Sequence, residues 1–201
     1  QRRATARILR RHHLEAVEEV RVPELDRDRA NGTRQLAKLD LRVGGGPGGP
    51  VRFADHKVSH PGARSYVRDA AKADGATARK GERAKAARYG RQVLALVNET
   101  YGRWGAEALH WWRALAKQVA ESDPLLKGRG KWAVAGLLAQ WWAETSVALQ
   151  RANAEALLAS LGEPARAPTT GEPDTAEAGE DGEDPGLGDG PTTDVLLPAG
   201  R

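Results

Sequence analysis

The chain contains no cysteine and no methionine among its 201 residues, and only one phenylalanine and three tyrosines. Without cysteine it cannot form disulfides, thiolate zinc sites or a cysteine nucleophile. No stretch reaches the roughly 18 consecutive apolar residues of a membrane helix, and no apolar segment follows the arginine-rich start. We therefore expect no membrane span and no signal peptide. The start at Gln1 predicts a piece of a longer reading frame.

Tryptophan is the abundant aromatic residue, with six copies that all lie between Trp104 and Trp142. Two adjacent pairs, Trp111-Trp112 and Trp141-Trp142, are either stacking platforms for single-stranded bases or core residues. The leucines around them favour the core. Because neighbours on a helix differ by about 100°, one member of each pair is expected to face outward or into another chain.

The net charge of +4 conceals two regions of opposite sign. Residues 163–201 carry ten acidic and two basic residues, so residues 1–162 carry a net charge of +12. The composition of residues 163–201, rich in proline, glycine, threonine and acid, predicts a disordered tail. Residues 1–162 form the predicted domain, and their positive charge fits either a nucleic-acid partner or a solvated surface.

The spacing of apolar and turn-forming residues predicts a mixed α/β domain, with a chain reversal at Asn31-Gly32 and interruptions at Asp74-Gly75 and Gly81. A glycine-rich loop at residues 44–50 separates two β-prone runs. The predicted elements, in chain order, are a helix over residues 4–20, a hairpin of residues 35–43 and 51–58, one or two helices over 63–91, a strand over 93–97 covered on both faces, and helices over 105–122 and 131–161.

The hairpin carries the residues best suited to chemistry, Asp40 in its first strand and Asp55 and Lys57 in its second. Alternation along a strand places Asp55 and Lys57 on one face and turns His56 away. Two converging carboxylates favour a hard divalent cation such as Mg²⁺, or Mn²⁺ in its place. A lysine beside such a cation can orient an attacking water, as phosphodiester hydrolysis requires.

Each of these residues also has a structural interpretation that the sequence leaves open. Asp40 is otherwise a surface residue paired with Lys38 or Arg42, and Asp55 a strand-end residue that caps the turn after Ser59. Lys57 is otherwise a solvated strand residue. The four-residue spacing of His56 and His60 does not orient both toward one zinc ion. No nucleophile elbow and no Gly-Lys-Ser/Thr phosphate loop are present, which excludes those classes of site.

The arrangement resembles the PD-(D/E)XK nuclease superfamily, whose core is a helix, a three-strand meander, a helix and a strand. Residues 34–161 also resemble the region downstream of the reverse transcriptase in retroelement polyproteins. The segments that carry this likeness are VRFADHKVSHPGARSYVRDAA, GERAKAARYG and VLALVNETYGRWGAEAL. The resemblance implies a restriction-endonuclease-like core, followed here by two tryptophan-rich helices.

The resemblance also implies roles for individual residues. Asp40 and Asp55 would hold the metal, and Lys85 and Tyr89 would accompany the catalytic centre from the following helix. The chain departs from the pattern at Leu39, where the motif has proline, and at Lys57, where the retroelement segments have a hydrophobic residue or threonine. Either Lys57 restores the Asp-x-Lys motif, or Lys85 is the catalytic lysine.

The implied activity is nicking of target DNA by a domain that works beside an upstream reverse transcriptase, with RNA as a further possible partner. Two alternatives stay open: a catalytically inactive nucleic-acid-binding module of the same polyprotein, and a helical protein-interaction domain. Two basic segments are expected to neutralise nucleic-acid phosphates, the arginine-rich start from Arg2 to Arg11 and residues 64–91 after the hairpin, so binding should weaken steeply with added salt. Six residues of the second segment are the named candidates for these contacts. They are Arg64, Arg68, Arg79, Lys80, Arg83 and Arg88.

Overall fold

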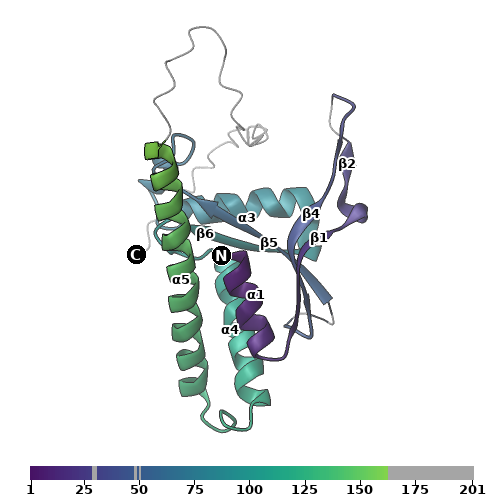
Figure 1. Ribbon diagram of the computed structural model, residues 1–201, viewed down its shortest axis with the longest axis vertical. Helices are drawn as coiled ribbons and strands as arrows, with labels where there is room; N and C mark the ends of the chain where they lie inside the picture. The colour runs from purple at the N-terminus through teal and green to yellow at the C-terminus, as the bar shows by residue number, and fades with distance from the viewer. Residues whose placement is uncertain (29–30, 48, 50, 163–201) are drawn as a thin grey trace, which may run out of the picture. The chain divides into compact units, whose positions relative to one another are not determined.

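The computed structural model describes residues 1–28, 31–47, 49 and 51–162. The tail predicted for residues 163–201 lies outside the described residues. The described chain combines a mixed four-stranded sheet with helices on both of its faces, which confirms the predicted α/β class (Figure 1). Within this part of the chain, no helix is both long and apolar enough to cross a membrane.

The sheet consists of β1 (Glu15–Arg21), β4 (Lys38–Gly44), β5 (Val51–Ser59) and β6 (Val93–Glu99), in that spatial order. The first three form an antiparallel meander, and β6 runs parallel to β5. A parallel return to the sheet needs a crossover connection. That connection is made by α2 (Val67–Ala70), α3 (Ala76–Tyr89) and the short 3₁₀ helix η2 (Gly90–Gln92).

A small two-stranded arm separates β1 from β4. It contains η1 (Pro23–Leu25), β2 (Arg27–Asp28) and β3 (Arg34–Gln35). Between its strands the Asn31 side chain accepts the backbone N–H of Thr33 at 3.0 Å, which is a turn-forming contact of asparagine. The reversal predicted at Asn31-Gly32 is therefore confirmed.

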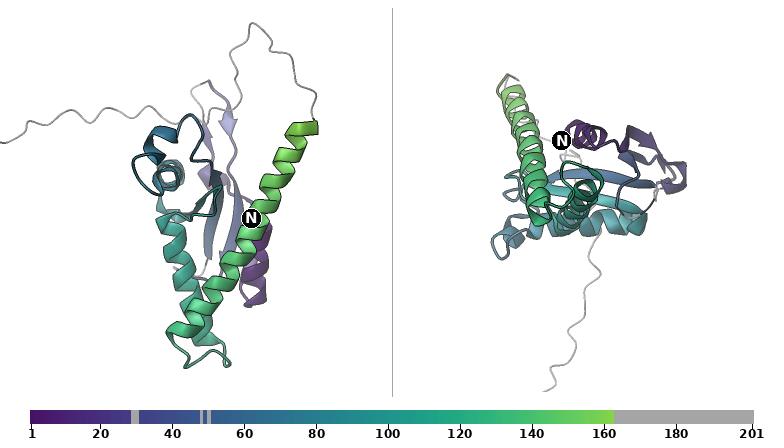
Figure 2. Two further views of the ribbon diagram at one scale, coloured as in Figure 1. Left: turned by 90° about the vertical axis from the view of Figure 1, so that its left-hand side faces the viewer. Right: turned by 90° about the horizontal axis from the view of Figure 1, so that it is seen from below.

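The two faces of the sheet carry different helices. The helices α1 (Arg2–Arg11), α4 (Ala106–Ser122) and α5 (Lys131–Gly162) share the larger buried cluster with β4, β5 and β6. On the other face Ala78 of α3 packs on Ala95 and Val97 of β6. Figure 2 shows α3 on the side of the sheet away from α1 and α5. Since both faces of β6 are covered, all seven of its residues are buried, as predicted.

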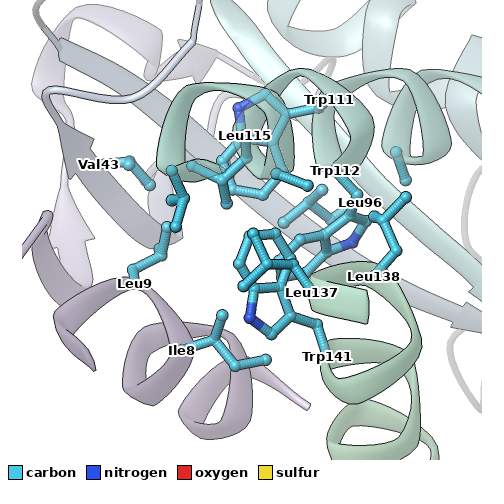
Figure 3. Packing of buried hydrophobic residues seen from close by; sticks show 14 of the residues in the cluster. Ile8, Leu9, Val43, Leu96, Trp111, Trp112, Leu115, Leu137, Leu138 and Trp141 are labelled. Carbon is cyan, nitrogen blue, oxygen red and sulfur yellow. The ribbon is translucent and has the colours of Figure 1, made fainter. Parts of the chain in front are cut away.

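The tryptophans form the centre of the larger cluster (Figure 3). The Trp112 ring lies 5.0 Å from Trp111, 5.6 Å from Trp141 and 6.0 Å from Trp104, measured between ring centroids. The core interpretation of these residues is confirmed. The expected outward residue is absent from the first pair, because Trp111 and Trp112 are both buried where α4 packs beside the sheet and α5. In the second pair Trp142 is half-buried.

The predicted helix over residues 4–20 is wrong beyond Arg11. The chain turns at His13, which has a φ of +60°, and residues 15–21 form β1 on the edge of the sheet. Apolar residues at mixed spacing fit a helix as well as a strand when the break between them is not recognised. The hairpin also begins later than predicted, with β4 starting at Lys38 instead of residue 35.

Gly81 does not interrupt its helix, in contrast to the prediction, but lies inside α3. A Cβ atom at this position would lie only 2.8 Å from Cγ1 of Val97 on β6. The glycine therefore permits close approach of helix and sheet. The predicted break at Asp74-Gly75 is confirmed, since Gly75 precedes α3 with a φ of +69°.

Candidate active site

Asp40 lies where the two central strands separate. The ladder between β4 and β5 ends at the pair Leu41–Ala54, while β4 stays paired with β1, and β5 with β6, beyond this point. One more step in the same register would set Asp40 opposite Asp55. Instead, the Asp40 carboxylate accepts the backbone N–H of His56 at 2.8 Å. The Asp40 side chain thus accepts a hydrogen bond from the His56 N–H, which has no partner in the β4–β5 ladder.

Two further groups surround the Asp40 carboxylate. The guanidinium of Arg2 on α1 lies 3.7 Å away, and Nδ1 of His56 lies 3.5 Å away. The other ring nitrogen of His56 is 3.1 Å from the hydroxyl of Thr5, also on α1. The His56 ring therefore points to the α1 face of the sheet, as strand alternation predicts.

Asp55 points to the opposite face, toward α3. Its side chain is nearly buried, and Lys85 donates a hydrogen bond to its carboxylate. The ammonium of Lys85 lies 5.9 Å from the centre of the Tyr89 ring, one turn further along α3. Tyr89 itself is only 5% exposed and packs among Val22, Ala37, Leu39 and Val93. The structure thus brings Asp55, Lys85 and Tyr89 together.

Lys57 shares the α3 face with Asp55 but is directed elsewhere. Its Cδ lies 3.6 Å from the position of a Cβ at Gly81, so its aliphatic stem lies against the middle of α3. Among the described residues no ion pair includes Lys57, whereas Lys85 pairs directly with Asp55. Of the two candidate lysines, Lys85 is the one at the carboxylate.

The structural interpretations of the two aspartates are not observed. Lys38 pairs with Glu19 at 2.7 Å and Arg42 with Glu15 at 2.5 Å, so neither serves Asp40. Asp55 is engaged by Lys85 rather than by the turn after β5.

The two carboxyl groups have pKa values shifted in opposite directions. Burial opposes ionisation of Asp40, but hydrogen bonds from His56 and the charge of Arg2 outweigh it and lower the pKa. Burial raises the pKa of Asp55 above its usual value, against the attraction of Lys85, and the negative charge of Asp40 raises it further. Burial, with the charge of Asp55, also raises the pKa of the Tyr89 hydroxyl. The charge of Asp40 thus acts on the ionisation of Asp55.

No group of three or more acidic or histidine side chains with metal-binding geometry occurs in the described part of the chain. Two neighbouring carboxylates nevertheless fit a hard cation such as Mg²⁺. In proteins Mg²⁺ is commonly held by one or two carboxylates, with water and substrate phosphate as the other ligands. For a metal ion to bind here, Arg2 at Asp40 and Lys85 at Asp55 would have to move aside.

Two acidic residues near this region have structural roles. Glu82 shares a helix with Lys85 and Tyr89, but its carboxylate accepts the backbone N–H of Glu107 at 2.8 Å, at the start of α4. Burial raises the pKa of Glu82. Glu99 accepts the backbone N–H of Ala78 at 3.3 Å, in the first turn of α3. Both satisfy N–H groups that a helix start leaves unpaired.

The six basic residues expected to contact nucleic acid all lie before or within α2 and α3, on the α3 side of the sheet. Arg64, Arg68 and Arg83 are exposed. The other three have local partners. Arg79 donates to the backbone oxygen of Asp74 at 2.7 Å, Lys80 lies 5.1 Å from the Tyr66 ring centre, and Arg88 lies 4.9 Å from that of Tyr89.

Sequence reasoning missed the groups that α1 contributes, namely Arg2 and Thr5. Their contacts with Asp40 and His56 join segments about 40 and 50 residues apart. No local pattern marks such a contact, because it depends on how α1 packs on the sheet.

Comparison with family models, with curated proteins and with solved structures found no significant match.

Proposed function

We propose that this chain is a metal-dependent DNA endonuclease domain of the PD-(D/E)XK type, from a retroelement reverse-transcriptase polyprotein. The order of its core elements supports the proposal. A helix, three antiparallel strands, a crossover helix and a parallel strand follow one another as the resemblance implies. Asp40 lies on the second of these strands and Asp55 on the third, so the two carboxylates lie on neighbouring strands.

The observation that carries the proposal is the contact of Lys85 with Asp55 beside Asp40. Burying a carboxylate next to a second carboxylate and a lysine costs stability. Such costly groups are commonly found at functional sites. Metal-assisted phosphodiester hydrolysis uses this set of groups.

Asp40 and Asp55 would hold Mg²⁺ or Mn²⁺. When bound, the ion would polarise a phosphate of the substrate and lower the pKa of a water molecule. Lys85 is the lysine of the site in this proposal, because its ammonium lies at Asp55, where it can hydrogen-bond an attacking water or a phosphate oxygen. Tyr89 is a positioning residue, since its buried ring lies under the Lys85 side chain. Lys57 has no part in the chemistry.

The test is nicking of supercoiled plasmid by the 201-residue chain with Mg²⁺, with Mn²⁺ and with EDTA. Asp40→Asn and Asp55→Asn keep a hydrogen-bond acceptor but remove the charge, and Lys85→Ala removes the ammonium. We expect metal-dependent nicking that falls by at least about 100-fold in all three variants. Lys57→Ala is the matched control and should retain wild-type activity. Metal-dependent nicking that is lost with Lys57→Ala and kept with Lys85→Ala would contradict the assignment of the lysine.

An inactive nucleic-acid-binding module is the second candidate, because both carboxylates already face cations of the chain itself. Nucleic-acid binding without nicking, unchanged by Asp55→Asn, would favour it. The third interpretation, a docking surface on the tryptophan-bearing helices, has less support at Trp111, Trp112 and Trp141, which lie in the core, and stays open at half-buried Trp142 and exposed Trp132.

A further inference from the structure

The solvent face of α1 carries a row of arginines at helical spacing. Arg3, Arg7, Arg10 and Arg11 are exposed, while Ile8 and Leu9 of the same helix are buried against the core. With Glu18 of β1 these arginines line an open groove of about 500 Å³. Four guanidinium groups therefore face one hollow beside a single carboxylate.

Only part of this positive charge is compensated within the chain. Arg10 pairs with Glu18 at 3.2 Å, and Arg11 pairs with Glu144 of α5 at 2.5 Å. Arg3 and Arg7 form no ion pair or hydrogen bond with any residue that the structure describes. The charge of Arg7 helps to lower the pKa of Glu144, but neither guanidinium group is held by a direct polar contact with a described residue, so both can bind an external anion.

The groove lies near Asp40, on the α1 side of the sheet, because Glu18, which lines it, also pairs with Arg2 at 3.6 Å, whereas Asp55 and Lys85 face α3. Arg2, the neighbour of Arg3, has its guanidinium 3.7 Å from the carboxylate of Asp40. On its inner side α1 is tied to β5 by the contact of Thr5 with His56. With a rise of about 1.5 Å per residue, Arg3 to Arg10 span about 10 Å. One nucleic-acid strand advances about 3.4 Å per nucleotide, so this length matches about three nucleotides.

The basic residues of α2 and α3 offer a less concentrated surface. Three of the six have local partners, as described above, and they lie across the sheet from α1. The arginines of α1 face one groove that leads away from Asp40.

We propose that the α1 groove, formed by Arg3, Arg7, Arg10 and Arg11, binds the phosphodiester backbone of a nucleic-acid strand. The planar guanidinium group can donate two parallel hydrogen bonds to a phosphate, which suits arginine to this role. The proposal deepens the nuclease function by naming the surface along which the substrate strand runs. It rests on that function for cleavage, but not for binding.

The test is the affinity of the 201-residue chain for labelled single-stranded DNA and RNA of one sequence, measured by fluorescence anisotropy in EDTA between 50 and 300 mM salt. Arg3→Gln/Arg7→Gln removes two charges from the groove. Arg129→Gln/Arg151→Gln removes two exposed charges that belong to neither basic surface and is the matched control. Far-UV circular dichroism checks that both variants keep the fold.

We expect the slope of log K against log salt to decrease in magnitude by about 1.4 in the groove variant, at about 0.7 per lost phosphate contact on a single strand. Its affinity at 100 mM salt should fall at least about tenfold, while the control loses less than about threefold. Equal affinity for DNA and RNA identifies the backbone as the ligand, and a preference for RNA identifies a contact with the 2′ hydroxyl.

Absence of wild-type binding, an unchanged slope in the groove variant, or an equal loss in the control would each overturn the proposal. Because the assay contains no divalent metal, it is independent of cleavage. Groove-dependent binding by a chain that does not nick DNA would contradict the nuclease function alone.

Discussion

Replacement of Lys85 by methionine should destabilise the fold by about 3 kcal/mol at pH 7. Asp55 is 7% exposed, and Lys85 is the cation that hydrogen-bonds its carboxylate. Removing one partner of a buried ion pair leaves an uncompensated charge and costs about 3–5 kcal/mol. The lower end of that range applies here because the Lys85 side chain is itself 18% exposed.

The pH dependence of this loss distinguishes a buried charge from lost packing. Burial already raises the pKa of Asp55 in the wild type, and loss of Lys85 should raise it further. An acid with a raised pKa in the folded state stabilises the fold at low pH, and this contribution is lost as the pH rises through that pKa. The cost of Lys85→Met should therefore be largest at neutral pH and shrink as the pH falls through the raised pKa of Asp55, where the carboxyl group becomes protonated in the folded variant.

Urea denaturation of the wild type and the variants at pH 7 and pH 4.5 measures both effects. Lys57→Met is the matched control on the same face of the sheet, and its cost should be below about 1 kcal/mol because Lys57 forms no ion pair among the described residues. The double variant Lys85→Met/Asp55→Asn should recover most of the stability, since both charges are gone. A pH-independent loss, or an equal loss from Lys57→Met, would refute the reasoning.

Two further substitutions test the packing that positions the site. Gly81→Ala should destabilise the fold by about 1–3 kcal/mol in urea denaturation, despite the better helix propensity of alanine, because the new Cβ would lie 2.8 Å from Val97. In a chain that also carries Val97→Ala, the clash should be relieved and Gly81→Ala should cost less. An equal cost of Gly81→Ala in both backgrounds would contradict this explanation. Trp112→Ala should cost about 3–5 kcal/mol in the same assay, whereas Trp132→Ala, at a residue 78% exposed on α5, should cost less than about 0.5 kcal/mol.

The central part of the fold was predictable because its signals are local. The glycine-rich loop separates two β-prone runs, and the run VLALV can only be a strand buried on both faces. Strand alternation correctly assigned Asp55 and His56 to opposite faces. The helix predicted through residue 20 failed because the break at His13 has no glycine or proline to mark it. As a result the edge strand β1, and with it the three-strand meander, was missing from the predicted order.

The two carboxylates of the candidate site were predicted, the lysine was left open between Lys57 and Lys85, and Arg2 was missed. Asp40 and Asp55 are neighbours because a hairpin brings its two strands together, and a hairpin is visible in a sequence. Lys85 reaches Asp55 only because α3 crosses the sheet in one orientation, and that orientation depends on the close approach permitted at Gly81. The motif pattern favoured Lys57, two residues from Asp55, although its side chain lies along α3.

The separation of β4 from β5 connects the fold to the proposed chemistry. While the two strands are paired, the N–H groups of each strand donate to the C=O groups of the other, so no N–H is free to donate to a carboxylate between them. Beyond Leu41–Ala54 the pairing stops, and the N–H of His56 turns to Asp40. This contact fixes one carboxylate in the opening between the strands, while Asp55 on the neighbouring strand is held by α3. Two negative groups are thus held by contacts with different elements, Asp40 by the backbone of β5 and Asp55 by α3. In the proposed function each would exchange its cation for the metal, and the substitutions at Lys85 measure how much the present cation contributes to the stability of buried Asp55.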